Sequence, residues 1–262
     1  MEPWQIIVAL IQGLVEWLPI SSEGQAILFV YNFSAIPPES LIGFVVWLHL
    51  GTALAVIVRY PRTILDVLMI KDRKLFRQLL IATVCTAITA IPLYIIIKNS
   101  IILFNGEIIN ILVGVLLLVT AFVLYLPTRT SEERIEYTEP TDRIAAATGF
   151  IQGFSVFPGL SRSGVTVSAL LMQKVDKETA LRFSFLMSVP AVLGILAIEL
   201  LNGDTIMTAI NPLDLLVIEI IVFIVGLASM EFLLRVARKV EFWKLCVILA
   251  VIAILFGIPA LL

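Results

Sequence analysis

Six long apolar runs limit what this chain can fold into. They cover residues 41–58, 79–97, 108–126, 183–201, 213–234 and 245–262. A helix needs about 20 apolar residues to cross a hydrocarbon core of roughly 30 Å, with a usual range of about 17–25. The chain is 60% apolar and only 15% charged, whereas a soluble domain is typically about 45–50% apolar. The sequence therefore predicts an all-α polytopic membrane protein with six transmembrane helices.

Two further apolar regions, residues 4–30 and 144–172, are interrupted near their middles by proline, glycine and serine. Each is too broken to form one clean helix. Non-helical backbone at membrane depth is tolerated only where it is buried in protein or lines a wet cavity. We therefore expect both regions to be re-entrant helical hairpins, which enter the membrane, turn at mid-depth and leave on the same side.

The basic residues agree with this topology. Of the 18 lysines and arginines, 16 cluster at 59–77, 129–143, 174–182 and 235–244. If the two broken regions are re-entrant, all four clusters fall on one face, and basic loops stay on the cytoplasmic side. If the broken regions were full spans, the clusters would fall on opposite faces. We therefore expect a multi-pass protein of the plasma membrane with both termini outside.

The two halves of the chain carry a weak internal repeat. Ile-Gln-Gly at residues 11–13 recurs at residues 151–153, Ser21 matches Ser161, and Gly24 matches Gly164. Each copy is one broken hairpin followed by three spans, so the second copy enters the membrane from the opposite side. Inverted repeats of this kind place a binding site near the midplane. The single membrane domain, 1–262, thus divides into a first repeat (1–127), a cytoplasmic linker (128–143) and a second repeat (144–262).

The break in the first hairpin carries a carboxylate. Gln12 and Glu16 are four residues apart and so share one helix face. Pro19 then ends this helix, because proline cannot donate to the helical hydrogen-bond ladder. A carboxylate inside a membrane hairpin costs a few kcal/mol and is a functional candidate by default. Glu16 is therefore a candidate functional residue.

Two serines, Ser21 and Ser22, lie where the next helix of this hairpin is expected to start. The spacing of Ser22 and Gln25 is that of a capping box, in which the serine side chain accepts a backbone N–H bond. The alternative to this structural reading is a functional role for the Ser22 hydroxyl. Both interpretations of Ser22 stay open, and nothing forbids one serine from doing both.

The break in the second hairpin has the chemistry of an anion site. Pro158 and Gly159 stop the incoming helix, and the next helix is expected to start near Ser161. Free backbone N–H groups and the positive end of the helix dipole attract anions there. Arg162 adds a planar fork that suits phosphate oxygens, and Ser161, Ser163 and Thr166 add hydroxyl donors. The pattern indicates a site for a phosphate or diphosphate.

At these motifs the chain resembles the undecaprenyl-diphosphate phosphatase family, the membrane enzymes associated with bacitracin resistance. The resemblance rests on residues 12–22 (QGLVEWLPISS), 158–164 (PGLSRSG) and 48–52 (LHLGT), and it extends over essentially the whole chain. It implies re-entrant hairpins, six spans and an inverted repeat. It also implies a site that faces the outer side and requires Mg²⁺ or Ca²⁺.

The resemblance implies roles for individual residues. Glu16 becomes the acidic catalytic or metal-positioning residue, Ser22 the nucleophile, and Arg162 the clamp on the diphosphate. Further substrate-binding positions implied by the two motifs are Gln12, Ser21, Gln25, Gly159, Ser161, Ser163, Gly164 and Thr166.

The chain departs from the family pattern at two positions. The family usually has Glu where this chain has Gln12, and His where it has Gln25. Both changes remove a group that could act as an acid, a base or a metal partner. Glu23 is a candidate replacement for the missing carboxylate. His49, the only histidine, lies in the first full span, where we expect it to pack or to line the pocket.

Two functions fit these features. The first is the hydrolysis of a polyprenyl diphosphate lipid, of undecaprenyl type, to the monophosphate and inorganic phosphate. The alternative is a polyprenyl-phosphate transporter, because inverted repeats with broken helices are transporter architecture. Signatures of other phosphatases, a Cys-x5-Arg loop or an Asp-x-Asp pair, are missing from the sequence. Membrane lipids are the other expected partners, nucleic acid is not expected, and the sequence leaves open whether two copies form a homodimer.

Overall fold

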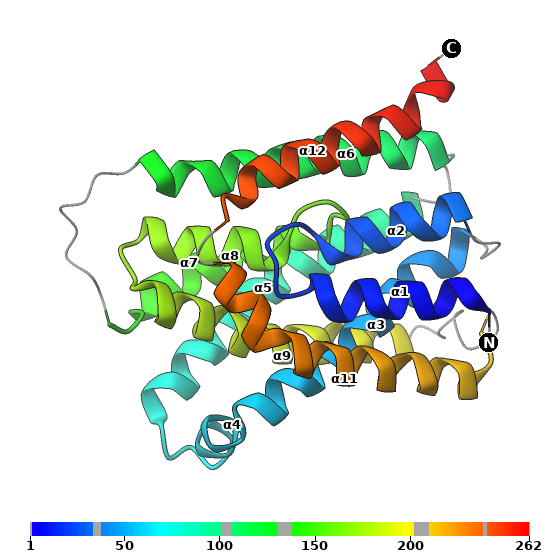
Figure 1. The fold of residues 1–262 in the computed structure, drawn as a ribbon. Helices are drawn as coiled ribbons and strands as arrows, with labels where there is room; N and C mark the ends of the chain where they lie inside the picture. The colour runs from blue at the N-terminus through cyan, green and yellow to red at the C-terminus, as the bar shows by residue number, and fades with distance from the viewer. Residues whose placement is uncertain are drawn as a thin grey trace.

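The computed structural model describes residues 2–33, 38–100, 106–129, 138–201, 210–237 and 240–261, and these residues form helices without strands (Figure 1). The α-helices are α1 Pro3–Val15, α2 Ser22–Phe33, α3 Pro38–Arg59, α4 Pro61–Leu68, α5 Arg73–Ser100, α6 Gly106–Tyr125, α7 Asp142–Gln152, α8 Arg162–Met172, α9 Lys177–Leu201, α11 Pro212–Ala237 and α12 Phe242–Gly257. Three short 3-10 turns are η2 Leu126–Arg129, η3 Gly153–Val156 and η4 Ile258–Leu261. The predicted all-α class is confirmed for the residues that the structure describes.

Five of these helices are long and apolar enough to cross a membrane. They are α3, α5, α6, α9 and α11, and they match five of the six predicted spans. The sixth predicted span, 245–262, falls on α12, an apolar helix of 16 residues that packs along α6 (Figure 1). The chain is therefore a multi-pass membrane protein.

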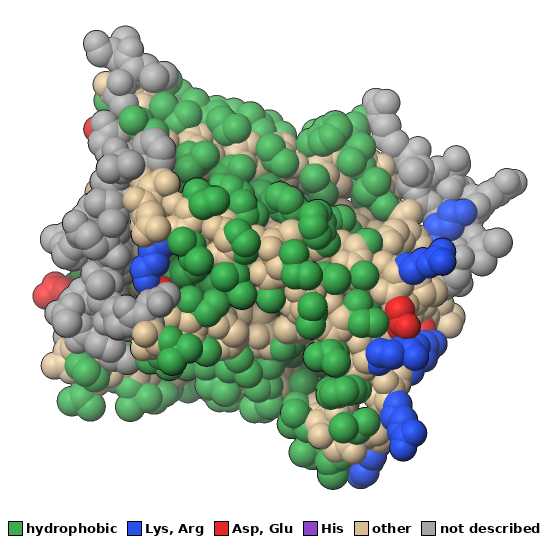
Figure 2. Space-filling model, turned by 180° about the vertical axis from the view of Figure 1, so that it is seen from behind, with side chains coloured by type: hydrophobic (Ala, Val, Ile, Leu, Met, Phe, Trp, Pro, Cys, Tyr) green, Lys and Arg blue, Asp and Glu red, His purple; other side chains and the backbone are tan. Residues whose placement is uncertain are grey.

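The outer surface of the molecule is apolar, as expected for a protein that lies in a lipid bilayer. Large apolar side chains that a soluble protein would bury are exposed on several helices, among them Ile88, Ile96, Phe122 and Phe232. Figure 2 shows hydrophobic side chains across most of the visible face, with most of the Lys and Arg side chains gathered at one end of it. This distribution is typical of helices that face lipid tails, with the cations held at a membrane–water interface.

Both broken regions form helical hairpins. In the first, α1 ends at Val15 and α2 begins at Ser22; in the second, α7 and η3 end at Val156 and α8 begins at Arg162. Within each hairpin the two helices pack against each other. The non-helical residues that the sequence predicted near the middle of each region are therefore present in both.

Each hairpin packs against a helix from the other half of the chain, α1 on α11 and α7 on α5. The matched glycines make this approach close. A Cβ on Gly13 would lie 3.0 Å from the side chain of Val225, and a Cβ on Gly153 would lie 1.7 Å from the hydroxyl of Thr89. Gly13 and Gly153, which match in the predicted repeat, therefore both allow a close approach of their hairpin to a neighbouring helix. The hairpins are held where their broken ends meet inside the bundle.

One helix was not expected from the sequence. Residues 59–77 were interpreted as a basic loop, but α4 forms within them, projecting from the bundle (Figure 1). Pro61 begins α4 at a position where a proline is well tolerated, because the first N–H groups of a helix have no partner. Leu65 and Leu68 on this helix are exposed.

Candidate active site

Four side chains from four helices converge on the carboxylate of Glu16, which is buried at the end of α1. Ser22 Oγ donates a hydrogen bond to Oε2 at 2.6 Å, and Gln12 Nε2 donates to the same oxygen at 3.0 Å. The guanidinium of Arg162 forms a hydrogen-bonded ion pair with Oε1. His49 Nε2 lies 3.6 Å from Oε2. The predicted helix face shared by Gln12 and Glu16 is confirmed.

The strained residue of the first break is Ser21, whose φ of 59° lies in the left-handed region. Its Oγ accepts hydrogen bonds from the backbone N–H of Gly24 and from the backbone N–H of Gly159, each at 3.1 Å. Ser21 therefore caps α2 and also ties the first break to the second. The cap considered for Ser22 belongs to Ser21, and this leaves the Ser22 hydroxyl directed at Glu16.

The second break repeats this cap. Ser161 Oγ accepts from the backbone N–H of Gly164 at 3.1 Å, as predicted for a helix that begins here. The backbone N–H of Ser161 donates to Thr120 Oγ1, which in turn donates to the carbonyl of Gly159. Gly159 has a φ of 109°, and a Cβ there would lie 2.6 Å from the carbonyl oxygen of Val113. Only glycine fits that position.

Arg162 begins α8 and reaches from the second half of the chain into the first. Besides Glu16 it donates to the carbonyl of Ser184 at 3.3 Å, and 17% of its side chain stays exposed. Ser163 Oγ lies next to it and donates to the carbonyl of Leu18 at 3.3 Å. The guanidinium is therefore held at two points and is still partly exposed, so an anion can reach it.

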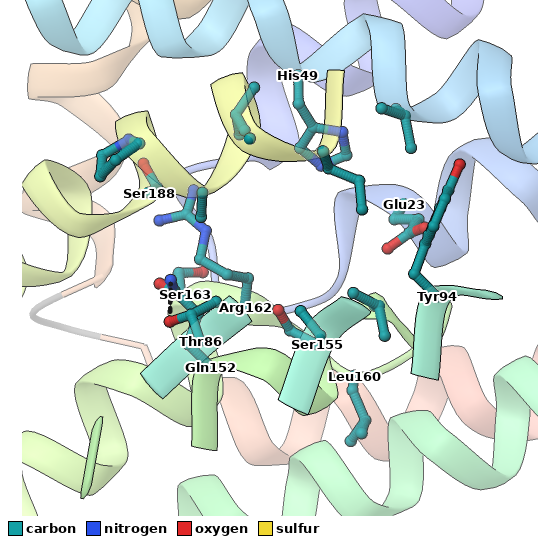
Figure 3. Close-up of a pocket in the computed structure, with 18 of the residues that line it drawn as sticks. Glu23, His49, Thr86, Tyr94, Gln152, Ser155, Leu160, Arg162, Ser163 and Ser188 are labelled. Carbon is teal, nitrogen blue, oxygen red and sulfur yellow. Dashed lines mark hydrogen bonds between the residues drawn. The ribbon is translucent and has the colours of Figure 1, made fainter. Parts of the chain in front are cut away.

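A cavity of about 390 Å³ opens above these groups (Figure 3). In the close-up, His49 hangs from above, Arg162 and Ser188 lie to one side, and Glu23 and Tyr94 lie to the other. Apolar residues of α5 and α9 extend the lining; they include Ala87, Ala90, Ile91, Val192, Gly194, Ile195 and Ile198. The cavity therefore has a polar end, where the two breaks meet, and an apolar part, which lies between α5 and α9.

Comparisons with known proteins show which family this chain belongs to. Residues 5–255 match the family described as bacitracin resistance protein BacA. The chain belongs to this family. A Methanopyrus kandleri protein called undecaprenyl-diphosphatase is 38% identical over 99% of this chain and 98% of its own length. Proteins of the same name are 36% identical in Methanothrix thermoacetophila, covering 95% of this chain and 94% of theirs, and 34% identical in Halothermothrix orenii, covering 91% of each.

In this BacA family member, the structure sorts the predicted site residues into two groups. The residues that line the cavity are Glu16, Ser21, Ser22, Ser161, Arg162 and Ser163. The other predicted site residues do not line the cavity and instead make hydrogen bonds that hold the two breaks in place. Gln12 holds Glu16, Gln25 donates to the carbonyl of Ile20 at 3.3 Å, and Thr166 Oγ1 is bonded to Arg162 O and to Ser184. Gly159 and Gly164 act through their backbone N–H groups.

His49 has a larger part in the site than the sequence indicated. The expectation that it lines the pocket is confirmed. Its Nδ1 lies 2.8 Å from the carbonyl oxygen of Val45. A carbonyl can only accept, so Nδ1 donates to it and Nε2 is the ring nitrogen that faces Glu16. The only signal in the sequence was a lone imidazole within an apolar span.

The described residues contain no group of three or more His, Cys, Asp or Glu side chains that could hold a metal ion by themselves. Two carboxylates, Glu16 and Glu23, do line the same cavity. Mg²⁺ is usually bound through one or two carboxylates together with substrate phosphates rather than by a cage of protein ligands. This donor set fits an ion that arrives with a phosphorylated substrate.

Proposed function

We propose that this chain hydrolyses a polyprenyl diphosphate of undecaprenyl type, giving the lipid monophosphate and inorganic phosphate. The observation that carries the proposal is the contact of Ser22 Oγ with Glu16 Oε2 at 2.6 Å, in a cavity that Arg162 also lines. These are the parts that phosphoryl transfer needs: a nucleophile, a proton acceptor and a cation. The names of the relatives, which share 30–38% identity with this chain, support the same reaction.

The diphosphate would bind at the start of α8. Arg162 offers its guanidinium, the Ser163 hydroxyl lies beside it, and both line the cavity. Diphosphate oxygens would compete with Glu16 for the arginine, because both are anionic acceptors of the same donors. Binding would therefore loosen the ion pair and free the carboxylate for proton transfer.

The chemical step then follows from the geometry around Ser22. Its Oγ attacks the terminal phosphorus, the bond from that phosphorus to the bridging oxygen breaks, and the lipid monophosphate leaves. Glu16 accepts the proton of the hydroxyl that it already holds. Water then cleaves the phosphoserine, with Nε2 of His49 placed to take a proton and Glu16 returning its own to Ser22.

A divalent cation, Mg²⁺ or Ca²⁺, would be held by Glu16 and Glu23 together with the phosphates. It would supply charge neutralisation at the diphosphate. Glu23 thereby takes the place of the carboxylate that the family usually has at Gln12. The amide of Gln12 keeps only the task of orienting Glu16, to which it donates at 3.0 Å.

The polyprenyl tail would leave the cavity between α5 and α9. Small residues open this lane, and a Cβ built on Gly194 meets nothing within 4 Å. Ile91 and Ile195 supply apolar walls on the two helices. An isoprenoid chain could lie in this lane while its head group stays at the two breaks.

The arrangement in the membrane is part of the proposal. We infer six spans, with α12 as the sixth, and two re-entrant hairpins in an inverted repeat, with both termini outside and a site reached from the outer side. Support comes from the reciprocal packing of α1 on α11 and α7 on α5, from the pairing of α6 with α12, and from the one-sided basic clusters. Cysteine-accessibility labelling of Glu2→Cys in intact cells would contradict the inference if only permeabilised cells react.

The experiment for the reaction is phosphate release from a polyprenyl diphosphate by the purified protein in detergent, with Mg²⁺ and then with a chelator. Ser22→Ala and Arg162→Ala should each abolish most activity. Arg59→Ala removes another ion-paired arginine, bonded to Glu231 at the surface, and should leave activity intact. Full activity in Ser22→Ala, or none in the unmodified protein, would refute the proposal. The transporter alternative gains no support from the relatives above, which are named for a phosphatase reaction.

A further inference from the structure

The cavity has a second polar wall that the reaction described above does not use. It consists of Gln152 at the end of α7, Thr86 on α5 and Ser155 in η3, all of which line the cavity. Figure 3 shows Gln152, Thr86 and Ser163 grouped beside Arg162. This wall therefore lies next to the residue that would hold the phosphoryl group.

Gln152 occupies the repeat position of Gln12, but its surroundings differ. Gln12 donates to Glu16 four residues later, whereas the residue four after Gln152 is Val156, which has no polar group. The amide of Gln152 instead donates from Nε2 to Thr86 Oγ1 at 3.1 Å. The hydroxyl of Thr86 in turn donates hydrogen bonds to two backbone carbonyls, Ala82 O at 2.8 Å and Gly149 O at 2.9 Å.

These bonds fix the orientation of the amide. Because Nε2 is occupied by the hydroxyl of Thr86, the carbonyl oxygen Oε1 is the free end of Gln152. Gln152 is only 2% exposed, so bulk water outside the protein does not solvate it. Its buried Oε1 nevertheless has no hydrogen-bond partner within the part of the chain that the structure describes. A buried carbonyl oxygen left without a donor is unfavourable by about 1–3 kcal/mol. A donor from outside the protein would remove this cost.

The two substrates of the proposed hydrolysis, the lipid diphosphate and water, differ in what they offer this oxygen. A diphosphate offers anionic oxygens, which repel a carbonyl oxygen, and an isoprenoid tail offers no donor. Water offers two O–H groups and is the second substrate of a hydrolysis. We propose that Gln152 Oε1, with Thr86 fixing its orientation, holds the water that attacks the phosphorus. This inference rests on the proposed function.

In the step itself, the water oxygen forms a bond to phosphorus while the bond from phosphorus to Ser22 Oγ breaks. One water proton passes to Nε2 of His49, and Ser22 Oγ takes back the proton held by Glu16. The second water proton stays on the oxygen that becomes part of inorganic phosphate. That retained O–H is the one that donates to Gln152 Oε1. Gln152 is thus a positioning residue for the nucleophilic water.

A competing alcohol tests this assignment. Methanol has one O–H, which must go to the base, so it has no second proton for Gln152. Gln152→Met should therefore slow hydrolysis by about tenfold to a hundredfold, as misplacement of a reactant does, and slow methanolysis much less. The measured ratio of methyl phosphate to inorganic phosphate should rise, with the KM for the lipid little changed. Gln152→Glu, which keeps an acceptor oxygen, should restore the ratio of the unmodified protein.

Thr148→Val is the matched control, because Thr148 is another buried polar residue one turn earlier on α7. It should leave the ratio unchanged. If Gln152→Met slows both reactions equally or raises only KM, the residue is structural or binds lipid, and the water role is refuted. If the unmodified protein releases no phosphate, the proposed function fails and takes this inference with it. An active protein with an unchanged ratio refutes only the role of Gln152.

Discussion

Substitution of Ser21 should destabilise the protein more than substitution of Ser161, the matched serine cap in the second repeat. Ser21 and Ser161 occupy equivalent repeat positions, and each accepts a backbone N–H bond from the glycine three residues later. Ser21 additionally accepts from the backbone N–H of Gly159, at 3.1 Å in a buried position. Its φ of 59° also places it in the left-handed region, whereas Ser161 has an ordinary φ of −64°.

The magnitudes follow from these contacts. Loss of a serine cap destabilises by about 1 kcal/mol, which is the expected effect of Ser161→Ala. Ser21→Ala loses the same cap and also leaves the N–H of Gly159 unpaired, which adds about 1–3 kcal/mol. Ser21→Gly loses both bonds too, but a left-handed backbone is unfavourable by about 1–2 kcal/mol for residues other than glycine. Ser21→Gly should therefore be about 1 kcal/mol less destabilising than Ser21→Ala.

The assay is thermal unfolding in a mild detergent, followed by tryptophan fluorescence. Trp17 is a suitable reporter, because it follows Glu16 directly and donates from Nε1 to the carbonyl of Gly226 at 2.9 Å. The apparent Tm should fall in the order unmodified protein, Ser161→Ala, Ser21→Gly, Ser21→Ala. Equal Tm values for the two alanine variants would refute the bridge between the breaks. A lower Tm for Ser21→Gly than for Ser21→Ala would refute the argument from backbone strain.

Three other outcomes are expected. Arg162→Lys should lower kcat/KM by about tenfold or more in a phosphate-release assay, because an ammonium cannot replace a planar fork that holds a phosphate at two points; an unchanged value would contradict the clamp. Gly153→Ala should lower the apparent Tm, because the added Cβ would lie 2.8 Å from a backbone nitrogen of α5, whereas Gly194→Ala, into open space, should not. Burial would raise the pKa of Asp176 in the α8–α9 loop, but hydrogen bonds from Thr179 and from the N–H of Glu178 outweigh it and lower this pKa. Asp176 should therefore stabilise the fold above the pKa that its carboxyl has in the unfolded chain, and this stabilisation should be lost as the pH falls through its pKa in the folded protein. On acidification, the free energy of unfolding should consequently fall less in Asp176→Asn than in the unmodified protein.

The reactive core of the site could be found from the sequence, because its residues are unusual for their surroundings. A carboxylate and an arginine within apolar hairpins need a reason, and Glu16 and Arg162 do line one cavity and form an ion pair. Local spacing also placed Gln12 on the face of Glu16. Local spacing failed at the cap, because the choice between Ser21 and Ser22 depends on the left-handed turn at Ser21 and on a bond to Gly159, far away in the chain.

The sequence alone determined that the chain lies in a membrane, that it is helical and that two of its apolar regions are broken hairpins. These properties depend on the length and composition of the apolar runs and on the local effects of proline and glycine. Tertiary structure alone decided which helices meet. It brought His49 from a span to within 3.6 Å of Glu16, and it turned Gln152 towards Thr86, 66 residues earlier. The physical reason is that hairpins from the two halves pack against helices of the opposite half. Contacts of this kind join residues whose spacing in the chain carries no information about their distance.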